Sequence, residues 1–169
     1  MSVTRFPAYL RIIGANASFK PQRREPTPIR NLQLDVPTGV ATRDALIERV
    51  KAIGEIAPSA PLSFLVAKVS GLASGDCDDQ LRVIARRIKE LVRGVDVVGR
   101  LDETSFGIAL QGSGFTAAGA VAARITHHLN RLAELSPSVC ITVSAATGTG
   151  VNAETLPLAA LDPYEPCCG

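Results

Sequence analysis

The chain has 169 residues, a formal net charge of +2 and 46% apolar residues. This length and composition suit one globular domain with extensions, and the small, scattered charge excludes nucleic acid as an obligate partner. No apolar run approaches the roughly 20 residues of a membrane-spanning helix, and the first residues lack the pattern of a secretion signal. We therefore expect a cytoplasmic protein without a membrane span.

Residues 1–34 form a predicted N-terminal arm. The segment 20–28 combines charges with three prolines, which deny the backbone a helix or a ladder. We expect a linker that is extended or mobile, and docking on a partner stays open as its role. At the other end, residues 149–169 show no periodicity and are predicted to be an irregular tail. The adjacent Cys167 and Cys168 lie there, and solvated thiols are favoured over a metal or redox site.

The predicted domain, residues 35–148, begins with a helix and a strand. Thr42 is a plausible N-cap, and Leu46, Val50 and Ile53 follow at helical spacing. The run 62–69 is almost continuously apolar, which is typical of a central strand covered on both faces.

A second helix and a hairpin come next. Leu81, Ile84, Ile88 and Leu91 form an apolar stripe, and Arg93-Gly94 reads as the end of that helix. Residues 95–99 and 106–110 are predicted strands joined by a turn at 101–105.

A third helix and a last strand complete the pattern. Ser113 is a predicted cap for a helix whose stripe runs from Phe115 to Leu132, and residues 139–144 form the strand. Alternating helices and strands predict an α/β sandwich, with helices packed on a mixed central sheet.

Two stretches carry a resemblance to a known family. Residues 35–40, Asp-Val-Pro-Thr-Gly-Val, precede Arg43, and Arg93-x-x-Asp96 precedes a turn closed by Phe106. In this order and spacing they resemble the GGDEF family, the diguanylate cyclase domains that condense two GTP molecules into cyclic di-GMP. The resemblance covers residues 35–148 and implies a nucleotidyl-cyclase-like sandwich whose hairpin carries the signature.

The signature turn departs from the family at its tip. The family has two glycines, which admit the triphosphate, and then two acids before the phenylalanine. The aligned residues here are Asp102, Glu103, Thr104 and Ser105, followed by the retained Phe106. The resemblance therefore implies a degenerate signature that repels GTP.

The metal position departs as well. Lys68 and Ser70 stand on the strand where the family carries metal-binding acids, and of the guanine loop only Gly75-Asp76 is retained. An ammonium group and hydroxyls do not hold Mg²⁺, and phosphoryl transfer depends on such charge neutralisation. We expect no metal, no cofactor and no catalysis. We also expect Lys68 to pair with Asp102 or Glu103 in place of the metal.

Three functions follow from this resemblance. The first is a pseudo-enzyme that works as a protein-interaction or homodimerisation module. The alternative is a cyclic di-GMP receptor in which Arg93, Asp96 and Arg124 match the family's inhibitory site. Against the receptor, Arg93 is explained as a helix-end residue, Asp96 as an acceptor for turn amides and Arg124 as an exposed cation. The third, an active cyclase, requires a register shift that would displace Phe106.

Overall fold

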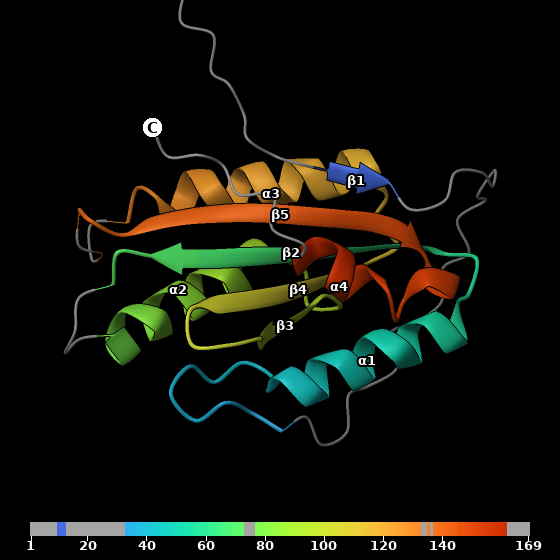
Figure 1. The fold of residues 1–169 in the computed structure, drawn as a ribbon, viewed down its shortest axis with the longest axis horizontal. Helices are drawn as coiled ribbons and strands as arrows, with labels where there is room; N and C mark the ends of the chain where they lie inside the picture. Colours follow the sequence, from blue (N-terminus) through green and yellow to red (C-terminus); the bar gives the residue numbers. More distant parts are fainter. Residues whose placement is uncertain (1–9, 13–32, 73–76, 133–134, 136, 162–169) are drawn as a thin grey trace, which may run out of the picture.

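The computed structural model describes residues 10–12, 33–72, 77–132, 135 and 137–161. The domain has the expected order of helix, strand, helix, hairpin, helix and strand (Figure 1). The elements are β1 (Leu10–Ile12), α1 (Arg43–Ile56), β2 (Pro61–Ser70), α2 (Cys77–Leu91), β3 (Val97–Arg100), β4 (Ser105–Gln111), α3 (Phe115–Leu129), β5 (Cys140–Thr149), a 3₁₀ helix (Gly150–Asn152) and α4 (Leu156–Leu161).

The sheet has the strand order β1-β5-β2-β4-β3. Strand β2 pairs antiparallel with both β4 and β5, and β3 and β4 form the antiparallel hairpin. The short strand β1 runs parallel to β5, so the sheet is mixed, as the sequence predicted.

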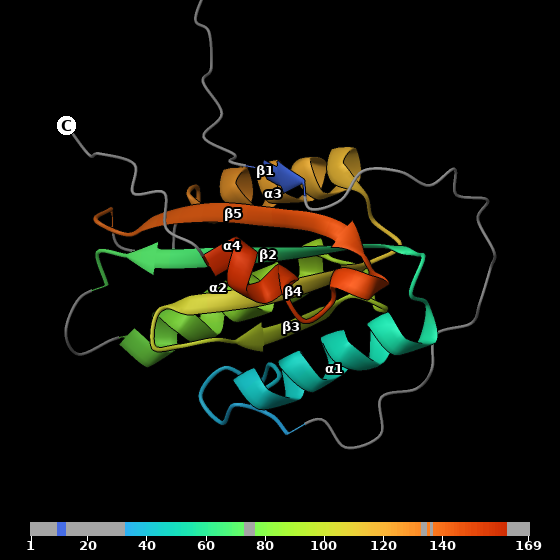
Figure 2. The same ribbon diagram turned by 45° about the vertical axis from the view of Figure 1, so that its right-hand side comes forward.

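Helices cover both faces of this sheet (Figure 2), with α2 and α3 on one face and α1 and α4 on the other. Because successive strand residues point to opposite faces, Leu65 and Ala67 of β2 pack toward α2 and α3, whereas Phe64 and Val66 pack toward α1 and α4. This double cover explains why the β2 sequence is a nearly continuous apolar run.

The outer edge of β3 is covered by the chain that leads into α1. The amide of Ala41 donates to the carbonyl of Val98 at 3.0 Å, and the amide of Arg100 donates to the carbonyl of Ala41 at 2.8 Å. An exposed strand edge invites pairing with other chains, so this contact protects the hairpin edge. It also brings the 35–40 loop beside the signature turn.

Strand β3 begins later than the sequence predicted. Val95 and Asp96 lie in a turn, in which the amide of Asp96 donates to the carbonyl of Arg93 at 2.9 Å and a carboxylate oxygen of Asp96 accepts from the amide of Arg93 at 2.9 Å. These two local bonds hold the backbone in the turn until Val97.

The start of α3 also differs from the prediction. The N-cap residue is Gly114, and its predecessor Ser113 is buried and bonds elsewhere. Phe115, predicted to belong to the apolar stripe, is 46% exposed. The buried stripe of α3 is Ala118, Ala122, Ile125 and Leu129.

Both ends of the chain contain regular elements. The arm contains β1, which is compatible with the expected extended conformation. The region predicted as an irregular tail contains the 3₁₀ helix and α4, so that expectation is wrong. Helix α4 forms because Leu156, Pro157 and Ala160 are buried against the sheet, and proline is tolerated in a first helical turn. Most of the arm, together with Cys167 and Cys168, lies outside the described residues. None of the described helices has the length and apolar character needed to cross a membrane.

Candidate functional site

The carboxylate of Asp96 is the centre of a hydrogen-bonded corner at the end of α2. Its side chain is 1% exposed. Oδ1 accepts from Nη2 of Arg93 at 3.3 Å and from the amide of Gln111 at 3.2 Å. Oδ2 accepts from the amide of Arg93 at 2.9 Å and from its Nε at 3.2 Å. A carboxylate has about four lone-pair positions, so Asp96 has no acceptor capacity left.

The guanidinium of Arg93 links α2 to the connection between β4 and α3. Besides Asp96, its Nη2 donates to the carbonyl of Gln111 at 2.9 Å and to Oγ of Ser113 at 2.7 Å. The hydroxyl of Ser63, in β2, donates to the carbonyl of Ser113 at 2.6 Å. Arg93 therefore has a structural role, although its side chain remains 58% exposed.

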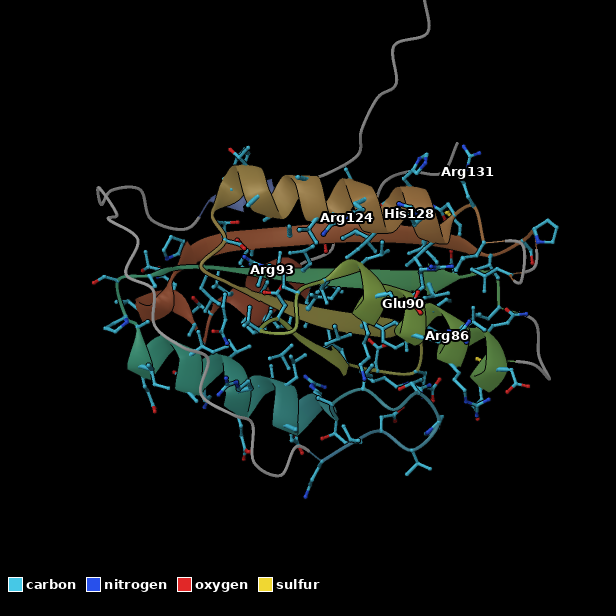
Figure 3. All side chains as sticks on the ribbon, turned by 180° about the vertical axis from the view of Figure 1, so that it is seen from behind. Arg86, Glu90, Arg93, Arg124, His128 and Arg131 are labelled. Carbon is cyan, nitrogen blue, oxygen red and sulfur yellow. The ribbon has the colours of Figure 1, made fainter. Side chains whose placement is uncertain are left out.

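Arg124 joins this corner from α3. Its Nη2 donates to the carbonyl of Leu91, the last residue of α2, at 2.6 Å. Figure 3 shows Arg93 and Arg124 on the same face of the molecule. The three residues of the predicted ligand site thus lie near the end of α2. Only the two arginines have exposed side chains that a ligand could contact, because Asp96 is buried.

The signature turn, residues 101–105, is held by its own polar groups. The amide of Leu101 donates to the carbonyl of Ser105 at 2.8 Å, and the amide of Thr104 donates to Oδ1 of Asp102 at 2.8 Å. The second bond is an Asx-turn, which aspartate forms readily. The carbonyl of Thr104 accepts from the amide of Val69 at 2.8 Å, which fixes the turn against β2.

Arg100 clamps this turn, a role that the sequence reasoning missed. Its Nε donates to the carbonyl of Asp102 at 3.1 Å, and its Nη2 donates to the carbonyl of Glu103 at 3.0 Å. Its Nη1 donates to Oδ2 of Asp35 at 3.3 Å. The side chains of Arg100 and Asp35 are only 16% and 21% exposed. The one signal for this contact in the sequence was that Asp35 and Arg100 have opposite charges and lie in the two stretches that resemble the family. The two residues are 65 positions apart.

Asp35 is ionised more readily than an ordinary aspartate. Burial raises its pKa, but hydrogen bonds from the hydroxyl of Thr38 at 2.5 Å and from Arg100, with the charge of Arg100, lower the pKa below its ordinary value of 3.8 overall. The folded pKa is therefore below the unfolded one. The resulting stability is present above pH 3.8 and is lost as the pH falls through the lowered folded value.

We expect Asp35→Asn to lower the free energy of unfolding by about 1–2 kcal/mol at pH 7, because the charge-assisted bonds to Arg100 and Thr38 are lost. Urea unfolding of both proteins between pH 7 and pH 3 would measure the difference. The difference should be constant near neutrality and shrink below pH 3.8, the ordinary value for aspartate. A difference that grows on acidification would contradict the charged role of Asp35.

The predicted ion pair between Lys68 and the turn is wrong. Lys68 lies opposite Ser105 of β4 and Thr142 of β5, and its side chain is exposed. Among the described residues it makes no ion pair with Asp102 or Glu103. It shares a strand face with Phe64 and Val66, but Lys68 lies beyond the cluster that α1 and α4 bury. An ammonium group that stays in water needs no partner.

The residues at the metal position do not fit Mg²⁺. Lys68 contributes a cation, and the hydroxyl of Ser70 donates to the carbonyl of Cys140 at 3.2 Å. Ser105 is buried, and Thr104 offers a neutral hydroxyl. Mg²⁺ requires carboxylates, phosphates and waters in octahedral geometry. In the parts of the chain that the structure describes, no group of three or more His, Cys, Asp or Glu side chains could hold a metal. Asp76, the retained guanine-loop residue, lies outside them.

Comparisons with known proteins agree with this architecture. Residues 33–155 match the family described as "Diguanylate cyclase, GGDEF domain". A search of curated proteins finds no match to the chain.

Several solved structures are similar. The GGDEF domain of FimX from Pseudomonas aeruginosa is 17% identical with a TM-score of 0.66, over 76% of this chain and 88% of that one. The GGDEF domain of DgcB from Caulobacter crescentus, solved in complex with c-di-GMP, is 12% identical with a TM-score of 0.62, over 80% and 91% of the two chains. SiaD from Pseudomonas aeruginosa, a diguanylate cyclase solved with its activator SiaC, is 23% identical with a TM-score of 0.62, over 76% and 57%.

Proposed function

Because the chain belongs to the GGDEF family, we propose that it is a non-catalytic regulatory domain of that family, which acts by binding another protein or a second copy of itself. The cytoplasmic location expected from the sequence belongs to the same proposal. Among similar structures, SiaD was solved with its activator SiaC, so one relative with this fold binds a protein.

The signature turn is the observation that carries the proposal. Asp102 and Glu103 stand where the family has glycines, and Arg100 holds the carbonyls of both residues. A carboxylate about 4 Å from a phosphate charge costs on the order of 4 kcal/mol at an effective dielectric near 20. The register of the hairpin supports the same reading. Phe106 pairs with Arg100 and is buried, whereas the two-residue shift that an active cyclase requires would displace it from this packing position.

Asp96 favours the interaction module over the receptor. In a receptor of the family type, a carboxylate would accept hydrogen bonds from guanine, but all four acceptor positions of Asp96 are used within the chain. The receptor remains the second candidate for one reason. Arg93 is 58% exposed, and Arg124 lies at the same corner, so two guanidinium groups face a shared surface.

We expect no cyclic di-GMP when the purified chain is incubated with GTP and Mg²⁺, with an active diguanylate cyclase as the positive control. Product formation by this chain would overturn the non-catalytic assignment. Calorimetric titration with cyclic di-GMP separates the other two candidates. Absence of heat is expected for the interaction module, whereas saturable binding that is lost in Arg93→Ala would establish the receptor.

The interaction module has its own readout. Light scattering of the full chain over a range of concentrations should show a dimer, or a mixture with a partner should show a stable complex. That assembly should survive Arg93→Ala. A monomer that forms no complex and binds cyclic di-GMP would reject the module and support the receptor.

A further inference from the structure

A hollow of about 420 Å³ lies between the 35–40 loop and α2, and its lining includes neither Arg93 nor Arg100. Its lining is Thr38, Gly39, Arg82, Arg86, Lys89 and Glu90. We propose that this hollow binds a compact polyanion, a chain of two or three phosphate groups. The inference is independent of the proposed function.

The three cations of the hollow lie on one side of α2. Arg82, Arg86 and Lys89 are spaced four and three residues apart, which at about 100° per residue places them within an arc of roughly 60°. With a rise of 1.5 Å per residue, the first and last backbone positions are about 10 Å apart. Adjacent phosphate groups of one chain can therefore each meet a cation.

The 35–40 loop anchors the two outer cations. Nε of Arg82 donates to the carbonyl of Pro37 at 3.0 Å, and Nζ of Lys89 donates to the carbonyl of Gly39 at 3.5 Å. These contacts limit the freedom of both side chains but use one donor of each. An ammonium group has three donors and a guanidinium has five, so donors remain for an anion. Gly39, with φ of 68°, adds no side chain on its side of the hollow.

Positive charge exceeds negative charge around the hollow. Three cations face one lining carboxylate, that of Glu90. Glu90 pairs with Arg87 at 2.9 Å and lies 4.0 Å from Nε of Arg86, so Arg86 is weakly held, and its side chain is 69% exposed. Arg82 is paired with Asp79, which lies outside the lining. Arg86 is thus the cation most available to an added anion, and phosphate oxygens form strong charge-assisted hydrogen bonds with arginine.

The hollow is distinct from the corner at the end of α2. Arg93 and Arg124 do not belong to its lining, and Figure 3 shows Arg86 and Arg93 at separate places along the molecule. Arg86→Gln therefore removes no hydrogen bond of the corner, and Arg93→Ala removes no lining residue of the hollow.

The test is calorimetric titration of the full chain with inorganic tripolyphosphate. We expect saturable one-to-one binding that Arg86→Gln and Lys89→Gln each weaken about tenfold, since one charge-assisted contact is lost in each. Arg87→Gln is the matched control, because Arg87 lies on the same helix and pairs with the same carboxylate, Glu90, but does not line the hollow. The variant therefore removes the same charge from outside the lining. It should change the affinity less than twofold.

Titrations with GTP and with ATP identify the source of the phosphates. If the hollow recognises phosphate groups alone, both nucleotides should bind about as tightly as tripolyphosphate. Tighter binding of one nucleotide would assign the site to that nucleotide. Equal losses in Arg86→Gln and Arg87→Gln would show diffuse attraction and overturn the proposal. So would the absence of saturation, or loss of binding in Arg93→Ala. None of these results depends on whether the chain dimerises or binds cyclic di-GMP.

Discussion

Phe106→Ala is expected to lower the free energy of unfolding by about 3–5 kcal/mol, the usual cost of emptying a fully buried aromatic position. Phe106 is 0% exposed and belongs to the core cluster under α2 and α3. It pairs across the sheet with Ala67 of β2 and with Arg100 of β3. The vacated volume would lie between β4 and the helices α2 and α3, in a cluster whose other members are also buried. Urea unfolding at neutral pH would measure the loss.

Phe115→Ala is the matched control for this prediction. The same side chain is removed from a position that is 46% exposed, so a change within about 0.5 kcal/mol is expected. Comparable losses in the two variants would show that Phe106 is not the packing residue of the hairpin.

The contrast between Phe106 and the turn before it explains how a GGDEF domain can keep its fold when the side chains of its signature turn change. Phe106 supports the core, whereas residues 102–104 reach solvent at a turn that Arg100 holds through carbonyl oxygens. A carbonyl is present whichever residue occupies the position. The turn can therefore change its side chains without loss of the contacts that fix its backbone.

The elements that could be predicted from the sequence are those whose side chains repeat with a regular period. The stripe of α2 and the apolar run of β2 are examples, and both came from burial against a large core. The spacing from Arg93 to Phe106 placed the hairpin within two residues of its observed bounds. Local periodicity is sufficient to predict a helix or strand when one long face of that element is buried.

The features that escaped prediction depend on contacts between distant residues or on very short elements. Nothing near Arg100 reveals that its partner is Asp35, because the loop reaches the hairpin only through the pairing of Ala41 with β3. The six residues of α4 are too few to show a helical period. Lys68 was misplaced because the strand pattern does not reveal how far α1 and α4 extend over the sheet.

Asp96→Ala is expected to lower the free energy of unfolding by about 2–4 kcal/mol. The variant leaves the amides of Arg93 and Gln111 without their acceptor, and an unsatisfied buried donor costs about 1–3 kcal/mol. Thermal or urea unfolding of the purified variant would measure the effect.

Arg93→Ala is the informative comparison, because it removes the exposed partner and leaves Asp96 paired with both amides. A loss of about 1 kcal/mol is expected, since the bonds from Arg93 are partly open to water. If Asp96→Ala costs more stability than Arg93→Ala, the carboxylate of Asp96 has a structural role and does not bind a ligand. If Asp96→Ala were as stable as the parent chain, its carboxylate would be free to accept hydrogen bonds from guanine, and the receptor would become the better assignment.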